Sequence, residues 1–154
     1  MRLRALALAF ALVCLAPLAH AEVTLQGEPE VGIFVTQQRD AQPGERVLTR
    51  ATDAIEPTTR IPARLGTRFG VRFSLAGKAT AEAPLSMFYF TPGVVTPDGT
   101  RHDKFEVHQK IEPATASEVM AFEFTDQWEV VPGEWRFEVY QGDRRLLSQA
   151  FQVQ

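Results

Sequence analysis

The 154-residue chain carries 16 lysines and arginines against 19 aspartates and glutamates, and 45% of its residues are hydrophobic. This length and composition suit one domain with a single core, and the small negative charge argues against nucleic acid or an anionic membrane surface as a partner, because those require a clustered positive excess. No run beyond the N-terminus approaches the roughly 18 apolar residues of a membrane-spanning helix.

The N-terminus has the pattern of a secretory signal peptide. Arg2 and Arg4 precede a short apolar run, and Ala19-His20-Ala21 has the small-x-small form of a cleavage site. We therefore expect residues 1–21 to be removed. The remaining chain, residues 22–154, would be periplasmic or secreted, with no membrane anchor.

The one cysteine, Cys14, lies inside this apolar run and follows Val13, so it lacks the small preceding residue that lipidation requires. After cleavage the chain would contain no cysteine. This excludes disulfides, thiol chemistry and thiolate metal sites, and leaves core burial to stabilise the domain.

The rest of the chain alternates between short apolar runs and turn residues. β-Branched and aromatic residues recur with a period of two, and Gly and Pro separate the runs. The expected strands are 23–26, 31–36, 47–51, 69–75, 85–90, 105–111, 119–124, 135–140 and 146–153. These patterns predict an all-β fold, an antiparallel β-sandwich of about seven to nine strands in a single domain. At most one helical turn is expected, at 114–120.

The run Leu85–Phe90 is the most apolar, which predicts a central strand buried on both faces. The hairpin that closes the chain turns at Gly142, since glycine adopts a positive φ without steric cost. Trp135 is in phase with Phe137 and is expected in the core. Trp128 precedes a Pro-Gly turn and is left open between packing and recognition of a partner.

The segment Thr52–Gly66 is irregular, because Pro57 and Pro62 lack a backbone donor and neither fits a central strand. The pattern leaves open whether this segment is an ordered loop or a binding arm.

Arginines recur every four residues up to Arg72, but Gly70 and the alternation of Phe69, Val71, Phe73 and Leu75 favour a strand over a helix. Arg68, Gly70, Arg72 and Ser74 would then share a solvated face. The alternative is an anion-binding strip, so Arg68 and Arg72, with Trp128, are the possible interaction residues.

The residues offer little catalytic or metal-binding chemistry. In a regular strand His102 and His108 would share a face with Glu106 but lie about 20 Å apart, too far to share a metal at about 3.3 Å per residue. A bend could bring Asp103 near His102, so His102, Asp103 and His108 are the candidate ligands, but no metal or other cofactor is expected.

No serine lies in a Gly-x-Ser-x-Gly elbow, and no glycine-rich loop leads into a helix, so no catalytic residue is expected. The carboxylates show no spacing typical of an acid/base pair. Five of them are expected to coat outward strand faces: Glu118, Glu123, Glu129, Glu134 and Glu138.

One stretch identifies a family resemblance. The segment Ile61-Pro62-Ala63-Arg64-Leu65-Gly66-Thr67-Arg68-Phe69-Gly70, together with the closing hairpin around Pro132-Gly133-Glu134-Trp135, resembles the bacterial domain of unknown function 3859 (DUF3859). The likeness covers most of the chain after the leader. It implies an exported domain with an immunoglobulin-like shape, and it supplies no activity, ligand or catalytic residues.

From these observations we expect a non-enzymatic β-sandwich that binds another protein or a cell-envelope component through a sheet edge or an end loop. The alternative is a carrier of a small ligand or of copper or zinc that uses His102, Asp103 and His108, with Met87 or Met120. A hydrolase with an unrecognised site is the third hypothesis.

Overall fold

The computed structural model describes residues 23–35, 49–81 and 83–154. The predicted signal peptide, the last residue of the strand predicted at 31–36 and the first two residues of the strand predicted at 47–51 lie outside these residues. The described part contains nine strands and two short 3₁₀ turns: β1 (Thr24–Val35), β2 (Ala54–Pro57), β3 (Arg60–Ile61), β4 (Arg68–Ala76), η1 (Lys78–Thr80), β5 (Leu85–Val95), β6 (Arg101–Gln109), β7 (Glu118–Glu123), η2 (Gln127–Glu129), β8 (Gly133–Gln141) and β9 (Arg144–Val153).

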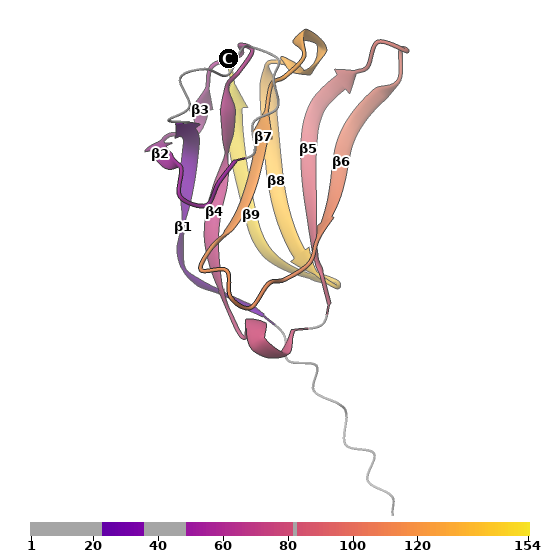
Figure 1. Ribbon diagram of the computed structural model, residues 1–154. Helices are drawn as coiled ribbons and strands as arrows, with labels where there is room; N and C mark the ends of the chain where they lie inside the picture. Colours follow the sequence, from indigo (N-terminus) through magenta and orange to yellow (C-terminus); the bar gives the residue numbers. More distant parts are fainter. Residues whose placement is uncertain (1–22, 36–48, 82) are drawn as a thin grey trace, which may run out of the picture.

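The strands form two sheets that face each other (Figure 1). The four-stranded sheet has the order β2-β1-β4-β7, and the five-stranded sheet has the order β3-β9-β8-β5-β6. All neighbours are antiparallel except β3 and β9, which run parallel. The prediction of an all-β sandwich is confirmed. No described residue belongs to a helix long and apolar enough to cross a membrane.

The core is aromatic and is centred on Phe69 of β4, which is fully buried. Its ring lies 5.2 Å from those of Phe137 and Phe151 in the opposite sheet and 5.4 Å from that of Phe124. Trp135 contacts Phe69 at 5.9 Å, and its indole N–H donates to a backbone carbonyl, so its predicted core position is confirmed. Burying such side chains contributes roughly 1.5–3 kcal/mol each, which stabilises this core in place of a disulfide.

Two glycines explain part of the motif between β3 and β4. Gly66 has φ +79°, a conformation that other residues rarely adopt, and its N–H donates to the carbonyl of Phe124 at 2.8 Å. A Cβ atom at Gly70 would lie 2.1 Å from the carbonyl oxygen of Met120 in β7. Only glycine lets β4 and β7 approach so closely, and this approach places Phe69 beside Phe122 of β7.

Some strands are longer than the apolar runs from which they were predicted. The two runs predicted before residue 36 form one strand, β1, because Gly27 produces a register shift against β4 between Gln26 and Glu30 rather than a break. The segment Thr52–Gly66 is ordered, since β2 pairs with β1 and β3 pairs with β9. Pro57 lies in the edge strand β2, where a missing donor is tolerated.

One further local prediction was wrong: the described part of the strand predicted at 47–51, Thr49–Ala51, is not a strand. At 114–120, where at most one helical turn was expected, the chain forms no helix and enters β7 at Glu118. The 3₁₀ turns lie instead at η1 and η2. In η2 the Asp126 carboxylate and the Glu129 carboxylate form a capping box, which fixes the turn before β8.

Candidate functional site

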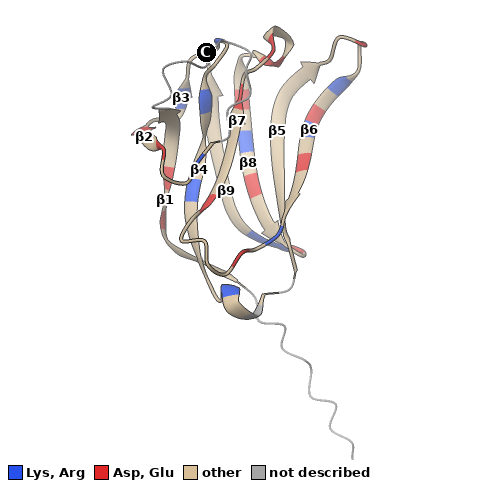
Figure 2. Ribbon diagram, viewed as in Figure 1, with Lys and Arg blue, Asp and Glu red and all other residues tan. Residues whose placement is uncertain are grey.

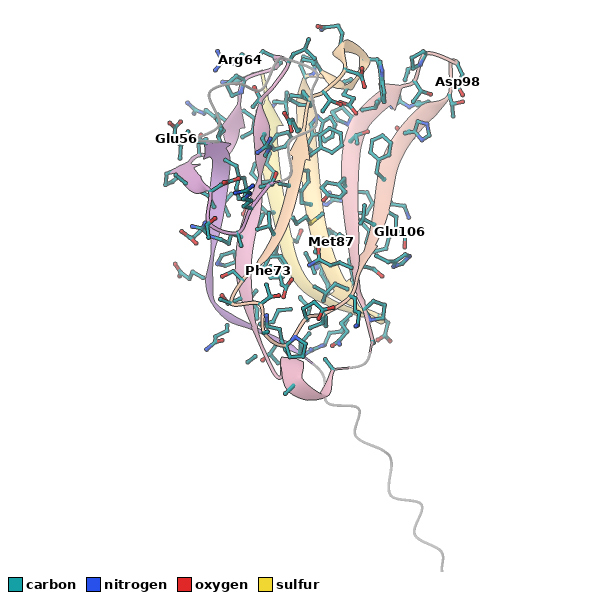
Figure 3. The ribbon with its side chains drawn as sticks, in the orientation of Figure 1. Glu56, Arg64, Phe73, Met87, Asp98 and Glu106 are labelled. Carbon is teal, nitrogen blue, oxygen red and sulfur yellow. The ribbon has the colours of Figure 1, made fainter. Side chains whose placement is uncertain are left out.

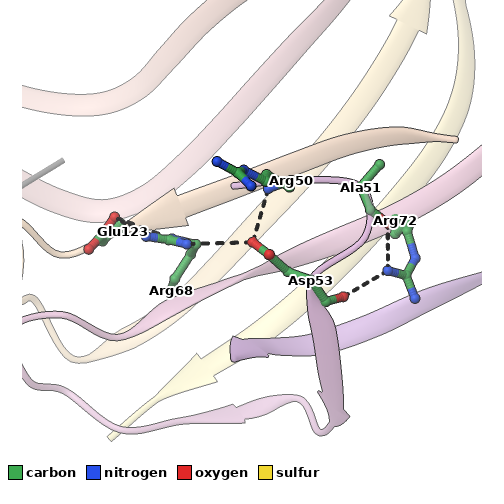
Figure 4. A network of polar contacts seen from close by, with 6 residues as sticks. All are labelled: Arg50, Ala51, Asp53, Arg68, Arg72 and Glu123. Carbon is green, nitrogen blue, oxygen red and sulfur yellow. Dashed lines mark hydrogen bonds and ion pairs between the residues drawn. The ribbon is translucent and has the colours of Figure 1, made fainter. Parts of the chain in front are cut away.

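The arginines of β4 face the outer side of the four-stranded sheet, but Arg68 is not solvated. Its side chain is only 4% exposed and donates to the Glu123 carboxylate through Nη2 at 2.9 Å and Nε at 3.2 Å. Asp53 lies 3.8 Å from Arg68 Nη1, in a segment that crosses the sheet (Figure 4). The prediction of a solvated face was wrong here, because Glu123 and the segment around Asp53 cover it.

Arg72 holds the same crossing segment. Its Nη1 donates to the backbone carbonyls of Ala51 and Asp53, both at 2.8 Å, and its Nε and Nη2 bind the Glu30 carboxylate. The hydrogen bond from Arg72 lowers the pKa of Glu30, and the same bond raises the pKa of Arg72. Since Arg68 and Arg72 are both occupied by carboxylates of this chain, the strip holds the fold together and offers little to an external anion.

Three of the five carboxylates expected on outward faces are buried. Glu118 is 3% exposed and accepts hydrogen bonds from Lys78 at 3.0 Å and from Gln109 at 2.7 Å. Glu129 is 4% exposed and accepts from the backbone N–H of Thr125 at 2.7 Å. Glu138 is also buried. The prediction was wrong because each carboxylate has partners that alternation along one strand does not reveal.

The two histidines do not share a face. His102 pairs across strands with the buried Val94, and its ring stacks on Phe105 at 5.3 Å, on the core side of the sheet. His108 pairs with Ser86 on the outer side. The regular strand assumed for the sequence prediction is interrupted by a register shift between Phe90 and Val94 of the neighbouring β5.

The candidate metal ligands are therefore not brought together. Asp103 pairs with Arg101, with Nη2 and Oδ1 2.8 Å apart, and Met87 and Met120 are buried in the core. Within residues 23–35, 49–81 and 83–154, no group of three or more His, Cys, Asp and Glu side chains could hold a metal ion.

A linear arrangement of three side chains on the outer face was missed by the sequence analysis. Ser86 Oγ lies 3.1 Å from His108 Nδ1, and His108 Nε2 lies 3.3 Å from Glu106 Oε1. All these contacts are satisfied when the serine donates to Nδ1 and a proton on Nε2 points to Glu106. A nucleophile, a base and an orienting carboxylate have this order in hydrolases. Here His108 is 63% and Glu106 is 40% exposed, so the row lies open to water rather than in a cleft.

Next to this row lies an aromatic face formed by Phe88, Phe90 and Tyr140. The Phe88 ring lies 6.3 Å from that of Phe90 and 5.5 Å from that of Tyr140. Lys104 lies 4.8 Å above the ring of Phe88, and Arg136 lies 4.8 Å above that of Phe90. A shallow cavity of about 350 Å³ opens over these rings. The prediction that this run is buried on both faces was wrong, because nothing described covers the outer one.

Glu138 is the cross-strand partner of Phe88 in this face and is 5% exposed. Tyr140 donates to it at 2.9 Å, Arg136 at 3.0 Å, Ser148 at 3.3 Å and Arg145 at 3.4 Å. Burial pushes the pKa of Glu138 upward, but the hydrogen bonds from Tyr140, Arg136 and Ser148 outweigh it and leave that pKa below its ordinary value. The same hydrogen bond to Glu138 raises the pKa of Tyr140. The charged carboxylate therefore orients Tyr140 and Arg136 against the two phenylalanines.

The strand β6 is the free edge of the five-stranded sheet, and its only strand partner in the described part is β5. Val107 pairs with the buried Met87 yet is 48% exposed. Charges of both signs mark this strand (Figure 2), and they belong to Arg101, Asp103, Lys104 and Glu106. Glu106 is labelled on this margin in Figure 3.

Of the residues predicted to interact with a partner, Trp128 is partly buried and packs against the core. Arg68 and Arg72 lie on the outer face of the four-stranded sheet, whereas the aromatic face belongs to the five-stranded sheet. The sequence pattern did not identify Phe88, Phe90 and Tyr140 as a surface. The only signal was that Tyr140 falls on the polar side of its strand.

The comparisons with known proteins concern the whole domain. The family model DUF3859, described as a domain of unknown function, matches residues 22–153. The crystal structure of an immunoglobulin-like protein from Pseudomonas aeruginosa, at 1.50 Å resolution, is 48% identical, with a TM-score of 0.76, over 88% of this chain and 99% of that chain. A comparison with curated protein sequences gave no match.

Proposed function

We propose that this chain, which belongs to the DUF3859 family and has an immunoglobulin-like fold, is a non-enzymatic binding module of the cell envelope that takes up an extended segment of a partner protein along β6. The observation that carries the proposal is the exposed Val107 on a free edge strand. The leader pattern in residues 1–21 supports the envelope location.

The free edge of β6 suits the addition of a strand. It is nine residues long, whereas the other edge strands, β2, β3 and β7, have four, two and six. An added strand would pair with backbone groups that no described strand uses, and its inward side chains would cover Val107. Burying an apolar side chain and satisfying a row of backbone groups both favour binding.

The charges on β6 select the partner. Lys104 and Glu106 alternate with apolar positions, so a bound segment requires an acidic and a basic residue in matching register. The same charges disfavour pairing with an arbitrary apolar edge, which is how exposed edges avoid aggregation. We therefore expect an extended segment with alternating apolar side chains and complementary charges.

Binding rather than catalysis is proposed because the Ser86–His108–Glu106 row is open to solvent. Hydrolases work in water-excluded sites with oriented donors for the developing oxyanion. A flat, solvated sheet face supplies neither condition.

The test places a photo-crosslinking residue, benzoylphenylalanine, at Val107 in cells that produce the protein. The matched control carries it at Ala150, which is exposed on β9 of the same sheet. A peptide that spans the crosslinked site of the captured partner is then synthesised, and its affinity is measured for the wild type, Val107→Asp and Ala150→Asp.

We expect crosslinks to one partner from position 107 only, and roughly tenfold or more weaker peptide binding by Val107→Asp alone. Equal crosslinking from both positions, no crosslink at position 107, or unchanged binding by Val107→Asp would overturn the proposal.

A further inference from the structure

We propose a second, separate binding site for a short peptide with apolar side chains, in the cavity at the end of the sandwich where β1 ends and the β3–β4 loop begins. The cavity has a volume of about 510 Å³. Small-molecule sites typically have volumes of roughly 300–1,000 Å³, so the space suits a ligand of this size. It is lined by residues of β1, β2 and the β3–β4 loop and by Arg68, the first residue of β4.

The first observation is a buried hydroxyl group. Thr67 lines this cavity and is only 7% exposed, yet its Oγ1 has no hydrogen-bond partner. Its backbone is satisfied, because its N–H donates to the carbonyl of Arg64 and its carbonyl accepts from Phe124. A buried hydroxyl without a partner is unfavourable, and a ligand that offers one would remove this cost.

The second observation is a pair of free charges of opposite sign. Arg64 and Glu56 both line the cavity and are exposed, and neither side chain forms an ion pair with any described residue. They come from the β3–β4 loop and from β2, at the same end of the molecule (Figure 3). Since Arg68 is already paired with Glu123, Arg64 is the cation available to a ligand carboxylate.

The third observation concerns the apolar walls. Val35 and Leu65 are 38% and 37% exposed, and both line this cavity. Pro62, which also lines the cavity, adds a rigid apolar surface. A carboxylate at Arg64 and Thr67, an ammonium group at Glu56 and apolar side chains on these walls together describe a short apolar peptide with free termini.

This site is distinct from the edge of β6. Its residues belong to β1, β2, the β3–β4 loop and the start of β4, none of which pairs with β5 or β6. The two proposals can therefore fail separately.

The test is a titration of the ¹⁵N-labelled protein with leucyl-leucine, followed by NMR. The same dipeptide with an acetylated amino terminus and an amidated carboxyl terminus is the ligand control. We expect saturable shifts at Leu65 and Thr67 with the free dipeptide, and weaker binding of the blocked one.

Variants assign the contacts. Thr67→Val keeps the shape of the side chain and removes the hydroxyl, and we expect about three- to tenfold weaker binding, the range for one lost hydrogen bond. Arg64→Gln, at an exposed position, should weaken binding at least as much, whereas the matched control Lys110→Gln, which is exposed directly after β6 and does not line the cavity, should not. Val107→Asp should bind the dipeptide normally. Shifts confined to other residues, no saturation at millimolar dipeptide, or unchanged affinity in both Thr67→Val and Arg64→Gln would overturn the proposal.

Discussion

Replacing Arg68 by methionine tests whether the arginine strip on β4 supports the fold. The change leaves the Glu123 carboxylate, 2.9 Å from the lost Nη2, and Asp53, 3.8 Å from the lost Nη1, without their cation. Removing one partner of a buried ion pair costs about 3–5 kcal/mol, because the remaining charge is poorly solvated. Glu123 and Asp53 keep 16% and 13% exposure, so some hydration returns and we expect about 3 kcal/mol.

The free energy of unfolding is measured by urea titration of the wild type and the variant. Arg64→Met is the matched control, since Arg64 is exposed and has no ion pair in the described residues, and we expect a change within about 0.5 kcal/mol. The double variant Arg68→Met/Glu123→Met removes both charges and should recover part of the loss. A loss below about 1 kcal/mol for Arg68→Met would refute a structural role and return Arg68 to the candidate interaction residues.

Two further outcomes concern the outer face of the five-stranded sheet. In the folded protein the pKa of Glu138 lies below its ordinary value of 4.5. Its charge therefore stabilises the fold at pH values above 4.5, and this stabilisation is lost as the pH falls through the pKa of the folded state. Glu138→Gln should therefore cost about 2 kcal/mol at pH 7 and less in acid, and a difference that stays constant from neutral to acid pH in urea titrations would contradict this. Ser86 should remain unmodified by a fluorophosphonate probe in mass spectrometry, because His108 is solvated. Labelling of Ser86 that disappears in His108→Ala would reveal a reactive serine and would count against a purely binding function.

The architecture could be predicted because it depends on local alternation. Trp135, Phe137 and Val139 fall on one side of their strand in any antiparallel pairing, so their burial follows from a period of two. Strand ends were less predictable. Gly27 and Pro29 are typical of a turn, but β1 continues through them because β4 pairs on both sides of the irregularity.

The polar interior could not be predicted, because its partners are distant in sequence. Arg68 and Glu123 are 55 residues apart, and Lys78 and Glu118 are 40 apart. In each pair, the alternation of one strand assigns its charged residue to solvent. The opposite charge is brought beside it only by the tertiary structure: β4 pairs with β7, and Lys78 of η1 contacts Glu118 of β7.

The aromatic face was missed for the opposite reason. Phe88 and Phe90 make the run Leu85–Phe90 continuously apolar, and periodicity cannot distinguish a strand buried on both faces from one that exposes aromatic residues on one face. The distinction depends on whether another element covers the outer side of the five-stranded sheet. No described element does, so the run Leu85–Phe90 forms an interior strand of the sheet, between β8 and β6, as predicted, but only one of its faces is buried in the core.

The margin between β6 and β7 connects these observations. The two sheets meet there through side chains: Phe105 stacks on Phe122 at 6.1 Å, and Gln109 donates to Glu118 at 2.7 Å. The two strands belong to different sheets, so these contacts close the core without using the backbone of the β6 edge. Because Phe105 closes the two sheets through its side chain, the backbone of β6 at Val107 is still able to accept a strand, and the proposed binding requires no opening of the core.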